Sequence, residues 1–332
     1  MFALIFFLLL GRVFSRSSAP LGSSNGTIRH WLYTSKINSE TLALLDRPDI
    51  AGIQALYKWK SLEPAENQYD FSSINNDLQL VKAKGKQLWV QLQDRTFDIR
   101  YNPVPKYLHA PIYNNGSVPM CDDNDCDTNY KHNGWLTAQW NPHVRRRFQA
   151  LMQEMANQLD GRIYGINLPE TAVAVQANNN FNFTVQGYFE AELENAKFAA
   201  TVFRKSYAVQ YVNFWPDGGD DERNYLAESF AFFAEHGVGV GGPDNIPCNK
   251  NHREYPLMSE YRNKVPIAVM AVQEPDLKYI NPITSERYTK EEFTDFAARH
   301  GIKILFWATC SPWLGLGRQQ CPLTETKKCP GH

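Results

Sequence analysis

Short apolar runs alternate with longer segments of helical periodicity along most of the chain. A continuous apolar run that lies between helical segments is typical of a parallel strand covered on both faces. The pattern therefore predicts a series of buried parallel strands. These eight runs lie at 28–34, 50–57, 87–92, 163–168, 208–214, 237–241, 266–272 and 302–307.

The segments between these runs predict helices. Pro142 suits the first turn of one helix, and Thr289 with Glu292 forms a capping box at the start of another. The signal at 259–263 is weak, and no helix is predicted after the last strand. Strong helical periodicity lies at 39–45, 73–84, 142–159, 185–206, 222–236 and 289–300.

Eight strands alternating with mostly helical segments predict an α/β fold, a single-domain (β/α)8 TIM barrel. The barrel should occupy residues 27–332, with a long loop at 93–141 between the third strand and the next helix. In place of an eighth helix, the segment 310–332 is rich in Pro, Gly and Cys and predicts an irregular tail tied by disulfides.

The first 19 residues have the features of a signal peptide. Their apolar run at 2–10 matches a signal core and is too short to span a bilayer. N-glycosylation sequons at Asn25, Asn115 and Asn182 agree with export. We therefore expect a secreted, extracellular protein that has no contact with a membrane once the signal is removed.

Six cysteines in an exported chain predict disulfides rather than a metal site. None of them falls in a predicted strand or helix. Cys121 and Cys126 are the most plausible pair, and Cys321 or Cys329 should tie the tail back to the barrel. A calcium site on Asp123, Asp125 and Asp127 is disfavoured, because the glycine and distal glutamate of a Ca²⁺ loop are missing.

The net charge and the absence of certain motifs exclude several classes of binding partner. The net charge of −1, from 34 basic and 35 acidic residues, provides no basic field for nucleic acid or an anionic membrane. No glycine-rich nucleotide or phosphate loop follows any strand, so no cofactor is predicted. The sequence does not specify an oligomeric state.

Two glutamates arrive at the ends of predicted strands. Glu170 follows the strand at 163–168 and Glu274 follows the strand at 266–272, and each lies next to a proline. Parallel strands of one barrel end on the same face, where catalytic groups of this fold lie. Two carboxylates in one cleft can divide the roles of acid and nucleophile.

Amides and flat aromatic rings also gather at the predicted strand ends. Such a lining suits a sugar, which offers hydroxyls for hydrogen bonds and C–H faces for stacking. The sequence therefore predicts an oligo- or polysaccharide substrate, without specifying the sugar or the linkage. The predicted binding residues are His30, Trp59, Gln91, Arg95, Asn167, Asn213, Trp215 and Trp307.

The stretch at 57–71, YKWKSLEPAENQYDF, resembles the segment after strand two of clan A (β/α)8 glycoside hydrolases, the clan of xylanase, cellulase and β-galactosidase families. Asn67 stands where the pattern W-x-x-L-E-P-x-x-G-x-Y-D-F has glycine. The resemblance implies a retaining hydrolase of β-linked glycans, with Glu170 as acid/base and Glu274 as nucleophile. In most of the clan an asparagine directly precedes the acid/base, whereas here Pro169 does and Asn167 lies three residues before it.

Two other functions stay open. A catalytically inactive barrel that binds carbohydrate or protein is compatible with the altered motif before Glu170. Metal-dependent hydrolysis, using His30, His109, His132 or Asp244, ranks last because no His-x-His or His-Glu-x-x-His spacing is present. Glu63, Asp244 and Asp276 are the alternative catalytic carboxylates if Glu170 and Glu274 do not form the pair.

Overall fold

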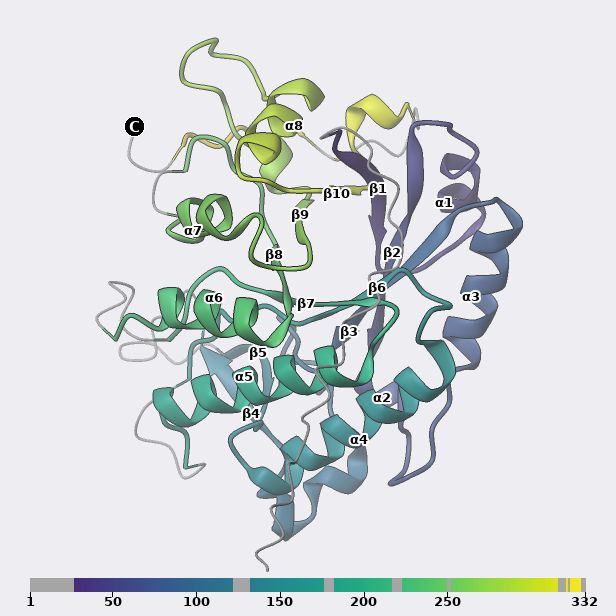
Figure 1. The fold of residues 1–332 in the computed structure, drawn as a ribbon, viewed down its shortest axis with the longest axis vertical. Coiled ribbons are helices and arrows are strands. Elements are labelled where there is room, and N and C mark those ends of the chain that lie inside the picture. Colours follow the sequence, from purple (N-terminus) through teal and green to yellow (C-terminus); the bar gives the residue numbers. More distant parts are fainter. Residues whose placement is uncertain are drawn as a thin grey trace, which may run out of the picture.

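The computed structural model describes residues 27–121, 132–175, 182–216, 223–249, 252–315, 321 and 323–329. Eight parallel strands close into a barrel, in which β1 pairs with both β2 and β10 (Figure 1). This confirms the predicted (β/α)8 barrel. The strands are β1 (Arg29–Thr34), β2 (Ile50–Lys58), β3 (Gln87–Gln93), β6 (Gly165–Leu168), β7 (Tyr207–Tyr211), β8 (Gly239–Gly242), β9 (Ala268–Val272) and β10 (Ile304–Ala308).

Helices connect successive strands and surround the barrel (Figure 1). Thr289 and Glu292 form the predicted capping box at the start of the last of them. The helices are α1 (Ser39–Leu44), α2 (Trp59–Leu62), α3 (Ser72–Ala83), α4 (Pro142–Leu159), α5 (Val185–Val202), α6 (Tyr225–His236), α7 (Glu254–Tyr261) and α8 (Lys290–Arg299).

Helix α7 differs from its prediction, because it begins five residues before the weak signal at 259–263. The sequence there contains Pro256, which argues against a helix interior. A proline in the first turn is tolerated, since the N–H groups of that turn have no partner within the helix. The proline therefore belongs to the start of α7 and does not interrupt it.

The long loop after β3 contains structure that the sequence did not predict. Two antiparallel strands, β4 (Ser117–Cys121) and β5 (His132–Thr137), form a separate sheet, and the 3-10 turns η1 (Lys106–His109) and η2 (Pro111–Tyr113) precede it. Pro119 and Gly134 interrupt the apolar pattern of these short strands, which hid them. The expectation that no cysteine lies in a strand is thus wrong for Cys121.

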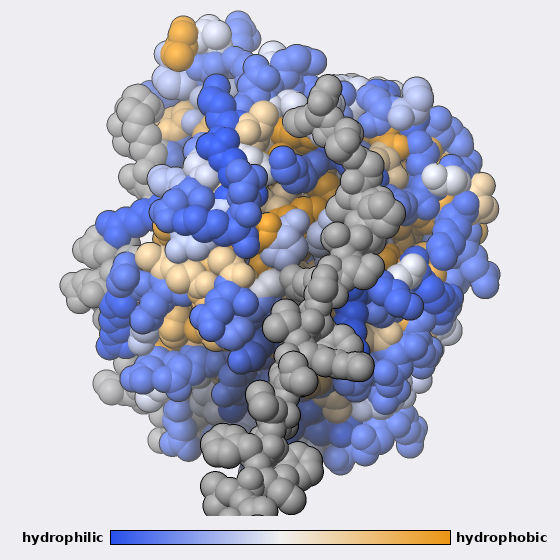
Figure 2. Space-filling model, viewed as in Figure 1, coloured by the Kyte–Doolittle hydropathy of each residue, from blue (hydrophilic) through white to orange (hydrophobic). Residues whose placement is uncertain are grey.

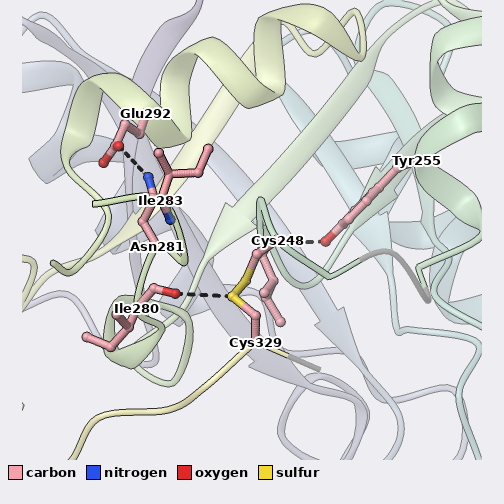
Figure 3. The surroundings of a disulfide bond; sticks show 8 residues. Cys248, Tyr255, Ile280, Asn281, Ile283, Glu292 and Cys329 are labelled. Atoms are coloured by element: carbon pink, nitrogen blue, oxygen red, sulfur yellow. Dashed lines mark hydrogen bonds between the residues drawn. A yellow bond between two sulfur atoms is a disulfide. The ribbon is translucent and has the colours of Figure 1, made fainter. Parts of the chain in front are cut away.

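A disulfide holds the tail against the barrel, as predicted. Cys248, after β8, pairs with Cys329 (Figure 3). Cys310, after β10, pairs with Cys321 within the segment 310–332. Within the described residues, β10 is followed by the short turn η4 (Pro312–Leu314) and by no eighth helix. The predicted partner of Cys121, Cys126, and the acidic residues around it lie outside the described residues.

Aromatic side chains fill the barrel beneath the C-terminal strand ends. Trp31 packs edge-on against Trp89 and Phe306, at centroid distances of 6.2 and 5.9 Å. Glycines on the adjacent strands make room for the two indoles: a Cβ on Gly52 would lie 2.5 Å from the Trp31 ring, and one on Gly165 would lie 2.7 Å from the Trp89 ring. This aromatic layer is therefore a closed floor, above which the barrel can open into a cavity.

Hydrophilic residues cover most of the face in Figure 2, and hydrophobic patches lie toward its middle. No helix among the described residues combines the length and the apolar character needed to cross a membrane. The sequon residues Asn115 and Asn182 are exposed. The predicted signal peptide at 1–19 and the sequon at Asn25 lie outside the described residues.

Candidate active site

A cavity of about 410 Å³ opens at the C-terminal ends of the strands, above the aromatic floor. Inward-facing strand residues and the start of the long loop after β3 build its wall. Of the predicted site residues, Gln91, Arg95 and Glu170 line it. The full lining is Tyr33, Gln54, Leu56, Lys58, Gln91, Gln93, Arg95, Thr96, Phe97, Asp98, Tyr101, Glu170, Tyr211, Pro243, Ala271 and Gln273.

Glu170 is the carboxyl group of this wall. Strand β6 ends at Leu168, so Pro169 and Glu170 leave the sheet at the mouth of the barrel. The surrounding barrel removes water from the carboxyl group, and the nearby negative charge of Asp244 adds to this effect. Together they raise the pKa of Glu170 from 4.5 to about 7, although Arg95 and a hydrogen bond from Asn213 act in the opposite direction. A carboxyl group with this pKa can hold a proton near neutral pH and give it up during a reaction.

Asn213, which follows β7, fixes the orientation of that carboxyl group. Its Nδ2 donates to Glu170 Oε2 at 2.8 Å. Its Oδ1 accepts from the backbone N–H groups of Ala172 and Phe214, both at 3.0 Å. Because the two backbone donors decide which way the amide faces, the NH₂ group is directed at Glu170. The predicted substrate-binding residue Asn213 thus contacts the carboxyl group and is not part of the cavity lining.

Arg95 supports Glu170 from below. Its guanidinium is fully buried and donates to the Glu170 backbone oxygen at 2.6 Å and to Tyr188 Oη at 2.8 Å. It also forms ion pairs of 2.9 Å with Asp94 and Glu192, which are buried as well. Because four of its five N–H groups donate within the protein, Arg95 acts mainly as a clamp between the end of β3, α5 and the loop after β6.

The predicted substrate-binding residue Asn167 lies deeper in the barrel than the cavity wall. It is fully buried, and its Oδ1 accepts from Gln54 Nε2 at 2.9 Å and from Trp89 Nε1 at 3.1 Å. Gln54 also donates to Tyr211 Oη at 2.8 Å. Asn167 therefore braces the side chains that form the base of the cavity and does not line the cavity itself.

The predicted tryptophans lie in the core. Trp59 is fully buried at the start of α2, with its ring 5.0 Å from that of Phe148, and Trp215 is buried between α5 and α6. Trp307 faces outward from β10 toward Phe293 of α8, and its Nε1 donates to His30 Nδ1 at 3.0 Å. None of the three lines the cavity.

His30 is neutral at pH 7, because burial and the positive charge of Lys290 lower its pKa to about 4. It accepts the hydrogen bond from Trp307 and packs against the Trp313 ring at 5.8 Å. These contacts lie on the outer side of the barrel, and His30 is not part of the cavity lining.

The carboxylates after β8 and β9 have different environments. Glu274 forms an ion pair of 2.8 Å with Lys278, is 32% exposed and does not line the cavity. Asp244 is close enough to raise the pKa of Glu170, and its own pKa is raised by burial, against the positive charges of His252 and Lys327. Asp276 is buried and accepts from the backbone N–H groups of Gln273 and Asn245.

Comparisons with known proteins bear on the fold. The chain has a TM-score of 0.54 with the catalytic domain of β-amylase from Paenibacillus polymyxa, at 8% identity over 85% of this chain and 92% of that chain. A psychrophilic family 10 endo-β-1,4-xylanase gives 0.48, at 11% identity over 87% and 90%. A family 10 glycoside hydrolase from Paenibacillus barcinonensis gives 0.45, at 12% identity over 90% and 88%.

The β-amylase comparison shows a shared barrel fold. No protein-family model and no curated protein sequence matches this chain. The individual family is therefore not identified.

Several cavity residues were not predicted from the sequence. Gln54 and Tyr211 alternate along their strands with residues that face the helices, and this period of two is the signal that could have found them. Phe97 and Tyr101 lie in a segment without regular structure, where no such signal exists. Among the described residues, no group of three or more His, Cys, Asp or Glu side chains is arranged to hold a metal ion.

Proposed function

We propose that the protein is a secreted glycoside hydrolase that cleaves a β-linked glycan with Glu170 as its general acid. The observation that carries the proposal is the Glu170 carboxyl group, which lines the cavity, is held by Asn213 and has a pKa of about 7. The clan A resemblance of the segment at 57–71 supports it further. The fold shared with a β-amylase catalytic domain supports it at the level of fold alone.

In the first step, Glu170 gives its proton to the glycosidic oxygen while the bond from that oxygen to the anomeric carbon breaks. A second carboxylate attacks the anomeric carbon and forms a glycosyl ester. Glu170, now ionised, then takes a proton from water while the water oxygen attacks the anomeric carbon. The bond from that carbon to the second carboxylate breaks, and the sugar leaves with its configuration retained. The carboxyl groups of Asp244 and Glu274 are the two candidates for that second role.

Asp244 is our choice for the second carboxylate, in place of the expected Glu274. What supports it is its electrostatic effect on Glu170 and its place directly after the cavity residue Pro243. Gln273 Nε2 lies 3.5 Å from Asp244 Oδ1 and belongs to the cavity wall. Neither Asp244 nor Glu274 is part of the lining itself, but Glu274 is engaged by Lys278.

Three substitutions test this assignment on aryl β-glycosides and on β-linked polysaccharides. Glu170→Gln should lose activity on polysaccharides but keep part of it on substrates with activated leaving groups, which need no proton. Asp244→Asn should abolish turnover of aryl glycosides and of polysaccharides. Glu274→Gln should leave the activity on both kinds of substrate nearly unchanged.

Proton NMR identifies the anomer of the sugar that is released first. It therefore tests, independently of the substitutions, whether the anomeric configuration is retained. If Glu274→Gln abolishes turnover and Asp244→Asn does not, the original pair of Glu170 and Glu274 is restored. If the unmodified protein is retained by glycans but hydrolyses none, a binding barrel replaces the enzyme.

A further inference from the structure

Two aromatic rings stand exposed at the mouth of the cavity. Phe97 is 57% and Tyr101 is 56% exposed, yet both belong to the cavity wall. Exposed rings of this size leave apolar surface in water, which is unfavourable unless a ligand covers it. Because they adjoin the cavity that contains Glu170, that ligand should be continuous with the one that fills the cavity.

The segment that carries these rings is firmly held. Thr96 exchanges two backbone hydrogen bonds of 2.9 Å with Trp135, which extends the β4–β5 sheet by one short bridge. The Trp135 indole N–H donates to the Ile99 carbonyl at 2.8 Å, and Thr96 Oγ1 donates to the Tyr101 carbonyl at 2.9 Å.

Gly134 permits this close approach, since a Cβ there would lie 1.8 Å from the Thr96 carbonyl oxygen. A segment anchored at both ends loses little conformational entropy when a ligand binds to it.

Polar and charged groups surround the rings. The Lys58 ammonium and the Arg100 guanidinium lie 5.6 and 5.4 Å from the centre of the Tyr101 ring. Lys58 and Asp98 themselves line the cavity. Flat rings edged by donors and acceptors match the two kinds of surface on a pyranose, whose C–H faces stack and whose hydroxyls form hydrogen bonds.

We propose that Phe97 and Tyr101 form an outer subsite that stacks a second sugar ring beyond the one in the cavity, so that the substrate is an oligosaccharide. This inference rests on the proposed function. The long loop after β3 then has a role in recognition, because it extends the binding surface from the barrel interior onto the β4–β5 sheet.

The experiment compares Phe97→Ala and Tyr101→Ala with the unmodified protein. A glycan array of β-linked oligosaccharides first selects the tightest-binding series, and calorimetry then measures Kd for one to six rings. The same variants are assayed on an aryl monosaccharide glycoside, which occupies the cavity alone. We expect about three- to tenfold weaker binding of oligosaccharides, a matching fall in kcat/KM on them, and a smaller fall in kcat/KM on the aryl glycoside.

Two further variants separate stacking from general effects. Phe97→Tyr keeps a flat ring and should restore binding. Ile283→Ala removes an apolar side chain that is 91% exposed and lies by the Cys248–Cys329 disulfide, away from the cavity lining, and should change nothing (Figure 3).

Binding is measured without turnover, so the subsite is tested even if no glycan is hydrolysed. Equal affinity for one ring and for longer chains, or unchanged affinity in both alanine variants, would overturn the outer subsite. So would an array on which no glycan is retained. Activity on the aryl glycoside in those cases would leave the proposed hydrolase intact.

Discussion

Replacing Glu170 with glutamine should stabilise the protein at high pH and leave it unchanged at low pH. In the unfolded chain this carboxyl group ionises near its ordinary pKa of 4.5, whereas in the native protein its pKa is about 7. Between these values the native state binds the extra proton. Stability therefore falls as the pH rises through this interval.

The size of the effect follows from the two pKa values. One pH unit corresponds to about 1.36 kcal/mol, so the interval between 4.5 and about 7 corresponds to ~3 kcal/mol of lost stability in the wild type at pH 8. Contact of the carboxyl group with cavity water reduces this figure, and we expect about 1–3 kcal/mol. Glutamine carries no charge at any of these pH values and can still accept the hydrogen bond from Asn213.

Urea unfolding at pH 4, 5.5, 7 and 8, with the disulfides intact, measures the difference. At pH 4 the variant and the wild type should unfold at nearly the same urea concentration, and at pH 8 the variant should be more stable. Glu235→Gln, at an exposed position of α6, is the matched control and should show no such trend. A difference that stays constant from pH 4 to pH 8 would refute the raised pKa and, with it, the assignment of Glu170 as the general acid.

Three other perturbations probe the supports of the site. Asn213→Ala removes a donor that favours the ionised form of Glu170, so the alkaline limb of the kcat/KM profile should move about one pH unit higher while kcat falls; an unmoved limb would contradict the contact. Arg95→Met leaves two buried carboxylates without their partner and should cost about 3–5 kcal/mol in urea unfolding; a loss below about 1 kcal/mol would contradict the clamp. Serine at both Cys248 and Cys329 frees the tail and should lower the unfolding free energy by about 2–4 kcal/mol, and an unchanged midpoint would show that the tail is held otherwise.

The barrel could be predicted because its strands are buried on both faces. Each strand then forms a continuous apolar run, and the runs at 50–57 and 87–92 agree with β2 and β3 within one residue. The sheet within the long loop after β3 could not be predicted, because β4 and β5 are short and, among the described residues, form their strand pairing with each other and a bridge to Thr96. Such elements depend on contacts between segments, which a local pattern does not contain.

A position near the end of a strand does not by itself place an aromatic residue at the site, because the direction of its side chain also matters. Trp307 lies in β10 next to Phe306, and successive strand residues point to opposite faces. Phe306 packs inside the barrel against Trp31, so Trp307 faces the helix layer. Trp307 lies near the strand end, which predicts a place at the site, but its side chain points into the core between the barrel and α8.

The positions of the side chains after β9 depend on contacts between two loops, which the sequence of a single strand does not specify. Asp276 accepts from the backbone N–H groups of Gln273 and Asn245 and so ties the turn after β9 to the loop after β8. This tie presents Gln273 to the cavity, and the next residue, Glu274, pairs with Lys278 outside it. The same tie keeps Asp244 beside the cavity. Contacts between two loops, such as the hydrogen bond from Gln273 to the Pro243 carbonyl 30 residues away, therefore set where the carboxylates after β8 and β9 lie. The matching positions of Glu170 and Glu274 along their strands could not predict this.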